Sequence, residues 1–201
     1  MNANLYARFH ASFAAHADMP ALVDADGIGP TFGQLDTLSA RFAVVLHQRG
    51  VMPGDRVVVQ VEKTVGAVAL YLACLRIGAI FVPLNTAYTA IEVDYFIEDA
   101  EPRLFVGRSD MLDEASPLWA AALVCEPDSG IVESGPDDIA VIVYTSGTTG
   151  RSKGAMLSHG NLAHNAQTLH DYWHFQPGDV LLHMLPTFHV HGLFVACHTT
   201  L

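Results

Sequence analysis

Apolar and polar positions follow two periods along this chain, and together they predict strands and helices that follow one another in turn. Short apolar runs bounded by turn residues predict strands at 21–23, 56–59, 80–82, 103–106, 139–143 and 180–185. Apolar residues at helical spacing predict helices at 5–13, 31–50, 64–77, 89–101, 118–123, 161–172 and from 192 onward. This alternation is typical of an α/β fold with a doubly wound sheet.

Two helix starts carry a specific signal. Thr31 is followed three residues later by Gln34, and Thr89 by Glu92. In such a capping box each side chain accepts a hydrogen bond from the backbone N–H of the other residue. Two backbone N–H groups at the start of the helix thereby gain a partner. We therefore expect helices to begin directly after Thr31 and Thr89.

The most informative segment is the loop at 144–154, which reads Tyr-Thr-Ser-Gly-Thr-Thr-Gly-Arg-Ser-Lys-Gly. It follows the apolar run at 139–143, which predicts a buried parallel strand. Glycines let backbone N–H groups approach phosphate oxygens closely, hydroxyl groups add donors, and a lysine adds a mobile positive charge. The loop is therefore predicted to hold a polyphosphate.

Two other interpretations compete for this loop: a flexible linker and a Walker phosphate loop. A run of Ser, Thr and Gly is often a flexible connection, but such a linker rarely joins a buried strand to another patterned segment. A Walker phosphate loop counted from Gly147 requires glycine at 152 and a hydroxyl at 154. Ser152 and Gly154 stand there instead, so the loop belongs to another phosphate-binding class.

The segment from Tyr144 to His159 resembles the signature loop of adenylate-forming enzymes, which include acyl-CoA synthetases, firefly luciferase and the adenylation domains of peptide synthetases. The segments at 83–89, 94–102 and 185–193 resemble further motifs of that family, in the same order. Within the family these motifs are most similar to those of malonyl-CoA synthetase. The resemblance extends over essentially the whole chain.

The resemblance implies a reaction in which a carboxylic acid and ATP form an acyl adenylate, and coenzyme A then displaces AMP. It assigns Lys153 to the developing charge on pyrophosphate and His189 to the bound acid, and it implies Mg²⁺ between the phosphates. The residues that it places around the phosphates are Thr145, Ser146, Gly147, Thr148, Thr149, Gly150 and Lys153. Protein ligands for the metal are not assigned.

Structural interpretations of the same side chains stay open. Lys153 is otherwise an ordinary surface lysine, and His189 a packed core histidine. His189 and His191 form a His-x-His pair, but no third zinc ligand is evident. His170 and His174 have helical spacing without the glutamate of a metalloprotease motif, so we expect surface histidines.

The family implies a longer protein, because its members run to more than twice 201 residues. Residues 1–201 are therefore expected to be the N-terminal portion of the AMP-binding domain, without its C-terminal part and without the small C-terminal domain. We expect this segment alone not to adenylate malonate. Two alternatives remain: a ligase for another acid, such as acetate, a medium-chain acid or an aryl acid, and a catalytically incompetent truncated fragment that acts only as a folded module.

Composition excludes several classes of function. The chain has 21 acidic and 10 basic residues, and its formal net charge of −11 argues against nucleic acid and anionic membranes as partners. The apolar stretch at 66–84 contains Arg76, Gly78 and Pro83, which favours a helix and a strand over a membrane span. No signal pattern opens the chain, so a cytoplasmic location is expected. Its three cysteines, at 74, 125 and 197, are predicted to be buried free thiols.

Overall fold

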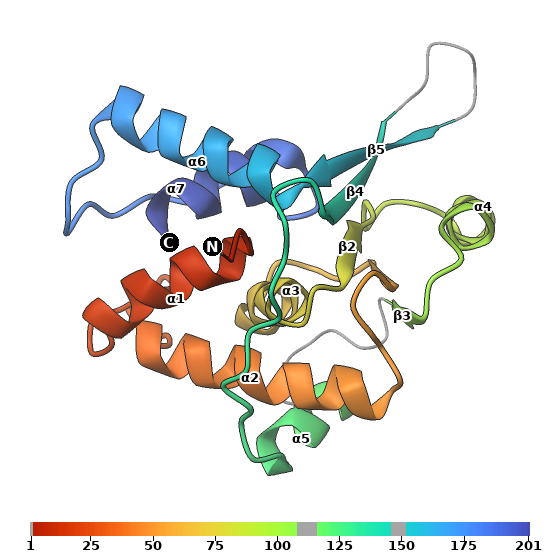
Figure 1. Ribbon diagram of the computed structural model, residues 1–201, viewed down its shortest axis with the longest axis horizontal. Coiled ribbons are helices and arrows are strands. Elements are labelled where there is room, and N and C mark those ends of the chain that lie inside the picture. The colour runs from red at the N-terminus through yellow and green to blue at the C-terminus, as the bar shows by residue number, and fades with distance from the viewer. Residues whose placement is uncertain (1, 108–115, 146–151) are drawn as a thin grey trace.

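A five-stranded sheet forms the centre of the computed structural model, which describes residues 2–107, 116–145 and 152–201 (Figure 1). The strand order is β3-β1-β2-β4-β5. Neighbours among the first four strands are parallel, and β5 pairs antiparallel with β4. The strands are β1 (Arg56–Val59), β2 (Ile80–Pro83), β3 (Leu104–Val106), β4 (Ile139–Thr145) and β5 (Lys153–Ser158). The predicted α/β class is confirmed.

The helices begin close to the positions that the pattern predicts. Side-chain capping boxes are present at Thr31 and Thr89, as expected, and a third is formed by Ser158 and Asn161. The helices are α1 (Leu5–Ala15), α2 (Phe32–Gln48), α3 (Val65–Arg76), α4 (Ala90–Ala100), α5 (Pro117–Val124), α6 (His159–Trp173), the π-helical η2 (His191–Cys197) and the short α7 (His198–Thr200).

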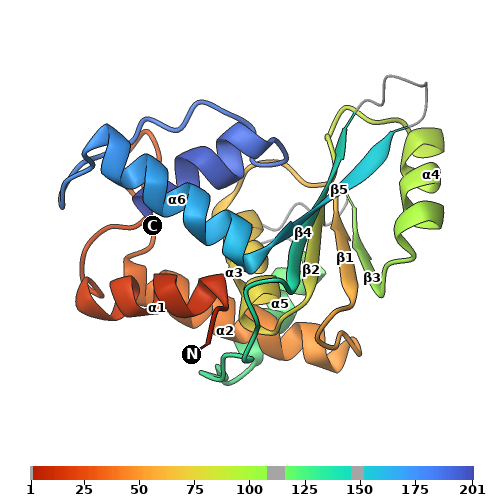
Figure 2. The same cartoon turned by 45° about the horizontal axis from the view of Figure 1, so that its top comes forward.

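The sheet is covered on both faces, as a doubly wound arrangement requires. Successive side chains of a strand point to opposite faces. Val57 and Val59 of β1 belong to the large apolar cluster that includes α1, α2 and α3, whereas Val58 belongs to a smaller cluster with Val93 and Phe96 of α4. Figure 2 shows α4 on one side of the sheet and α2, α3 and α5 on the other. Within the described residues, the apolar cluster on this second face draws its helical members from α4, which also lies beside the β4–β5 pair.

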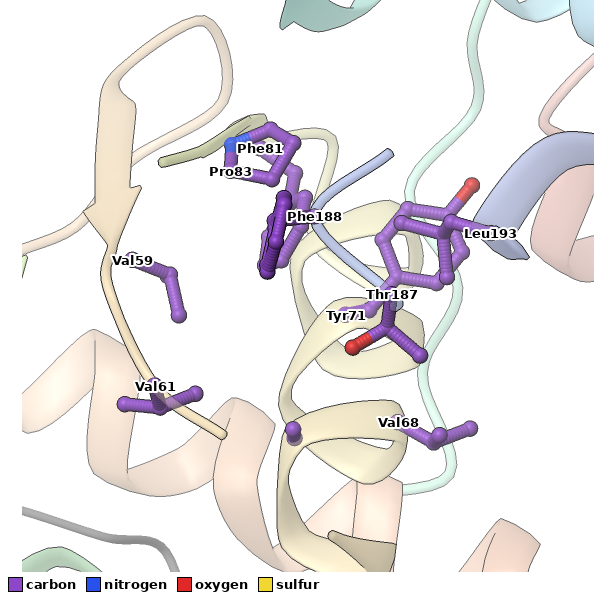
Figure 3. A pocket seen from close by; sticks show the side chains of 10 residues that line it. Val59, Val61, Val68, Tyr71, Phe81, Pro83, Thr187, Phe188 and Leu193 are labelled. Atoms are coloured by element: carbon purple, nitrogen blue, oxygen red, sulfur yellow. The ribbon is translucent and has the colours of Figure 1, made fainter. Parts of the chain in front are cut away.

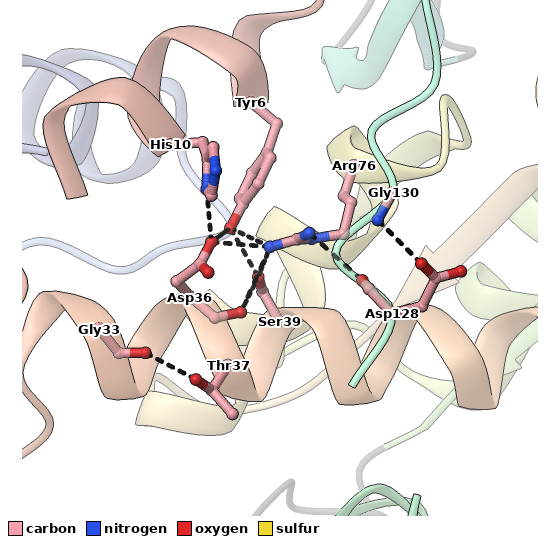
Figure 4. Close-up of polar contacts among 9 residues, drawn as sticks. All are labelled: Tyr6, His10, Gly33, Asp36, Thr37, Ser39, Arg76, Asp128 and Gly130. Atoms are coloured by element: carbon pink, nitrogen blue, oxygen red, sulfur yellow. Dashed lines mark hydrogen bonds and ion pairs between the residues drawn. The ribbon is translucent and has the colours of Figure 1, made fainter. Parts of the chain in front are cut away.

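A buried arginine joins the N-terminal helices (Figure 4). Arg76, at the end of α3, is fully buried. Its Nη2 donates to Asp36 Oδ1 at 2.7 Å and to the Tyr6 hydroxyl at 2.6 Å. Its Nη1 donates to the Asp128 carbonyl at 3.3 Å, and its guanidinium lies 4.4 Å from the centre of the Tyr6 ring. The ion pair with Asp36 connects α3 to α2, and the hydrogen bond to Tyr6 connects α3 to α1. These contacts explain how the apolar run around Arg76 tolerates a charge.

No helix in the described part of the chain is both long enough and apolar enough to cross a membrane. The 12-residue helix α3 covers the first part of the apolar stretch, and β2 follows it after a turn at Gly78, whose φ is 70°. The interpretation of this stretch as a helix followed by a strand is therefore confirmed. Cys74 and Cys197 are buried free thiols as expected, whereas Cys125 is only half-buried.

Two predicted strands are absent, so those predictions were wrong, and one observed strand was not predicted. Residues 21–23 form no strand, and only an isolated bridge joins Pro20 to Thr31. Residues 180–185 also lack strand structure, and the side chains of Val180, Leu182 and Met184 are exposed. A strand requires a hydrogen-bonded neighbour, and no described strand lies beside either segment. Residues 153–158, which carry no strand prediction, form β5 because β4 offers them a free edge.

Candidate functional site

The predicted phosphate loop connects two antiparallel strands. Thr145 is the last residue of β4, Lys153 is the first of β5, and the two are register partners. The Thr145 hydroxyl donates to the Lys153 carbonyl at 3.4 Å. The predicted loop residues Ser146, Gly147, Thr148, Thr149 and Gly150 lie outside the described residues. The structure therefore places the two ends of the predicted site, Thr145 and Lys153, side by side.

Both of these end residues are available to a ligand. The side chains of Thr145 and Lys153 are exposed. Among the described residues, no carboxylate forms an ion pair with Lys153. A cation without a protein counter-charge and a neighbouring hydroxyl group match the oxygens of a polyphosphate. The residues present therefore fit a nucleotide's phosphates.

Aromatic side chains of α4 hold the base of this loop. The Tyr95 hydroxyl donates to the Ser152 carbonyl at 2.9 Å, and the Tyr144 hydroxyl donates to Asp99 Oδ2 at 2.6 Å. The Phe96 ring lies 4.6 Å from the Tyr144 ring, centre to centre. Burial and the Asp99 carboxylate raise the pKa of Tyr144, so its hydroxyl stays protonated and donates. The sequence motifs contain these residues, but nothing in their pattern indicates that they meet.

A glycine is required where β5 begins. A Cβ at Gly154 would lie 2.8 Å from Ile142 Cγ2 and 3.5 Å from the Tyr144 ring. Glycine thus lets the side chains of β4 cross over the backbone of β5. The last glycine of the signature segment is explained by close packing beneath the loop.

The second predicted catalytic residue lies on another segment. His189 is exposed, in a turn where its N–H donates to the Pro186 carbonyl at 3.3 Å. The neighbouring Phe188 is half-buried and lines a small apolar pocket with Tyr71 and Phe81 (Figure 3). The ring of Phe188 thus anchors the turn, and the interpretation of His189 as a packed core histidine is wrong.

The pocket itself is too small for a substrate. Its cavity volume is about 10 Å³, which is the space of roughly one water molecule. Thr187 and Leu193 also line it, next to α3 (Figure 3).

Within the described residues no hydrogen bond or ion pair joins His189 to Lys153, so the structure does not bring the two predicted catalytic side chains together.

A buried histidine lies beside this pocket. The Tyr71 hydroxyl lies 2.7 Å from His198 Nε2, and the two rings are stacked with their centres 5.7 Å apart. Burial lowers the pKa of His198 to about 3 and raises that of Tyr71 well above its ordinary value. The imidazole is therefore neutral at physiological pH and shares a hydrogen bond with the Tyr71 hydroxyl. This pair was not among the predicted functional residues, since only the fold brings it together.

Metal ligands do not gather in the described part of the chain. No group of three His, Cys, Asp or Glu side chains there could hold an ion. His189 and His191 have ring centres 5.7 Å apart, but both side chains are exposed. His170 and His174 are exposed on or next to α6, as predicted.

Comparison with known proteins identifies the family. The model of the AMP-binding enzyme family matches residues 9–201. The chain belongs to this family. The resemblance of its motifs to adenylate-forming enzymes is thereby confirmed. Among curated relatives, a feruloyl-CoA synthase of Amycolatopsis is 32% identical over 184 residues, covering 87% of this chain and 38% of the relative. An oxalate–CoA ligase of Arabidopsis thaliana is 32% identical over 196 residues, covering 85% of this chain and 38% of the ligase.

Several solved structures share the fold. MatB from Rhodopseudomonas palustris has a TM-score of 0.89 and 44% identity, and the match covers all of this chain and 43% of MatB. An ATP-bound structure of MatB matches with a TM-score of 0.87. VinN in complex with 3-methylaspartate has a TM-score of 0.86 and 26% identity, and the match covers 98% of this chain and 58% of VinN. The chain thus spans about 40% of the length of the curated relatives that it matches first.

Proposed function

We propose that this chain is part of an ATP-dependent acid–CoA ligase that activates a short carboxylic acid, with malonate as the favoured substrate. The observation that carries the proposal is the pairing of Thr145 with Lys153 at the mouth of the β4–β5 hairpin. In a member of the AMP-binding family, this geometry supports a site for the phosphates of ATP. Residues 1–201 then form the N-terminal portion of the AMP-binding domain, and a cytoplasmic location fits the ligase.

The proposed roles follow from charge and exposure. Attack of a carboxylate on the α-phosphorus of ATP brings two anions together, so the barrier falls mainly through positioning and charge neutralisation. The Lys153 ammonium would neutralise charge that develops on the departing pyrophosphate. The hydroxyl of Thr145, which donates to the Lys153 carbonyl at 3.4 Å in this structure, would instead donate to a phosphate oxygen, beside the loop residues at 146–150. Mg²⁺, when bound, would supply further positive charge to the phosphates.

His189 would act on the acid. Its imidazole is exposed, while Phe188 fixes the turn that carries it. A side chain with these surroundings can turn toward a carboxylate and hold it, with a ring N–H as donor. Coenzyme A would then enter as the second co-substrate and release AMP.

The names of the relatives support a dicarboxylic acid. Oxalate, in the name of the plant ligase, has two carboxyl groups, as does the 3-methylaspartate bound to VinN. Malonate belongs to the same chemical class. The feruloyl-CoA synthase favours a second candidate, a ligase for an aryl acid.

The test is the activity of the protein encoded by the complete reading frame. Formation of acyl-CoA would be measured with ATP, coenzyme A and one acid at a time: malonate, oxalate, acetate, octanoate and ferulate. The proposal expects malonate to have the highest kcat/KM. A preference for ferulate would favour an aryl acid as the substrate. A preference for acetate or octanoate would exclude dicarboxylic acids as the substrate class.

A further inference from the structure

We propose that Tyr95 of α4 is a positioning residue for Lys153, acting through the peptide group that joins Ser152 to Lys153. The inference rests on the proposed ligase function, in which Lys153 acts on the phosphates. It assigns a role in that reaction to a residue that lies outside the signature segment and 57 positions away from Ser152.

The geometry defines what Tyr95 can do. Its hydroxyl donates to the Ser152 carbonyl at 2.9 Å. A peptide group is planar, so a bond to this carbonyl also fixes the orientation of the Lys153 N–H. On its other side, the Lys153 carbonyl accepts from the Thr145 hydroxyl at 3.4 Å. Both peptide groups of Lys153 are thus held, while its side chain stays exposed and can reach a ligand.

The helix that carries Tyr95 is itself well anchored. The Tyr95 ring lies 5.3 Å from that of Phe96, which belongs to the apolar cluster between α4 and the sheet. The Tyr144 hydroxyl donates to Asp99 one turn further along α4, and this second bond joins the helix to the end of β4. A side chain supported in this way fixes its hydrogen-bond partner more firmly than a loop residue would.

Tyr88 offers a matched control. Its ring also contacts Phe96, at 5.0 Å between centres, and among the described residues its hydroxyl has no hydrogen-bond partner. Tyr88→Phe therefore removes a hydroxyl from the same aromatic cluster without a contact to Ser152. Any effect that Tyr95→Phe shares with Tyr88→Phe reflects packing of the cluster.

The experiment is a double-mutant cycle in the protein encoded by the complete reading frame, with adenylation measured as ATP–pyrophosphate exchange. Tyr95→Phe should lower kcat about fivefold, the factor that one neutral hydrogen bond is worth. The KM for the acid should change less than about twofold, and Tyr88→Phe should match the wild type. In a Lys153→Ala background, Tyr95→Phe should have almost no further effect, because it acts through that lysine. An equal loss in both backgrounds would overturn the proposal.

A second measurement keeps this inference separate from the proposed function. If the wild-type protein shows no ATP–pyrophosphate exchange with any of the acids, the ligase proposal fails. Amide hydrogen exchange then tests the role of Tyr95 on its own. Tyr95→Phe should then speed exchange in peptides that cover residues 152–154, relative to the wild type and Tyr88→Phe. Unchanged exchange in those peptides would show that Tyr95 does not position Lys153.

Discussion

Replacing Asp36 with asparagine should strongly destabilise this chain. The Asp36 carboxylate accepts hydrogen bonds from Arg76, from the Tyr6 hydroxyl and from His10 Nδ1 (Figure 4). Asparagine keeps nearly the same shape but carries no charge. The guanidinium of Arg76, which is fully buried and always charged, then lacks its counter-ion.

The magnitude follows from the burial of the two partners. Removing one partner of a buried ion pair costs about 3–5 kcal/mol. The Asp36 side chain is 25% exposed, and Arg76 keeps its bonds to Tyr6, Ser39 and the Asp128 carbonyl. We therefore expect the lower end, about 3 kcal/mol, which corresponds to a fall in Tm of roughly 6–12 °C for a chain of this size.

Urea unfolding followed by circular dichroism measures the effect. Thr37→Ala is the matched control, because Thr37 is the next residue of α2 and its exposed hydroxyl donates only to the Gly33 carbonyl, at 2.8 Å. It should stay within about 0.5 kcal/mol of the wild type. Arg76→Met should cost less than Asp36→Asn, since the remaining carboxylate reaches water. The reverse order, or a cost below about 1 kcal/mol for Asp36→Asn, would refute the reasoning.

Two further predictions concern packing and pH. Gly154→Ala should lower the free energy of unfolding by about 1–2 kcal/mol, because its Cβ overlaps the stiff Ile142 side chain, and it should cost less in an Ile142→Ala background. Urea titrations of the four proteins would show this, and an equal cost in both backgrounds would contradict it. The pKa of His198 is lowered to about 3 by folding, so below its ordinary value the unfolded chain binds a proton that the native chain does not. Stability should therefore fall by about 2 kcal/mol between pH 8 and pH 5 through this group. A His198→Phe variant should lose correspondingly less over the same range, and an identical slope would exclude His198 as the cause.

Local signals predicted much of the fold. The capping boxes at Thr31 and Thr89 depend on residues three positions apart, and both are present. The strand at 56–59 was predicted with its observed bounds, because an arginine and three consecutive valines there follow a Pro-Gly turn. Such features depend on residues that are close together in the sequence, so a sequence pattern can predict them.

The remaining features depend on contacts between distant segments. The apolar run at 180–185 resembles a strand, but no described strand lies beside it and its apolar side chains are exposed. The roles of Tyr95 and Tyr144 arise because α4 lies beside the β4–β5 hairpin. For the candidate site, the family resemblance predicts Thr145, Lys153 and His189, which stays a prediction, and the structure shows the contacts that hold their segments.

The most direct test of the central claim is ATP–pyrophosphate exchange with malonate in the protein encoded by the complete reading frame. We expect exchange that depends on malonate and that Lys153→Ala lowers by on the order of 100-fold, as for a group that stabilises charge in the transition state. Arg49→Ala, which removes an exposed positive charge at the end of α2, should match the wild type. Exchange that is absent with every acid, or that survives unchanged in Lys153→Ala, would contradict the account.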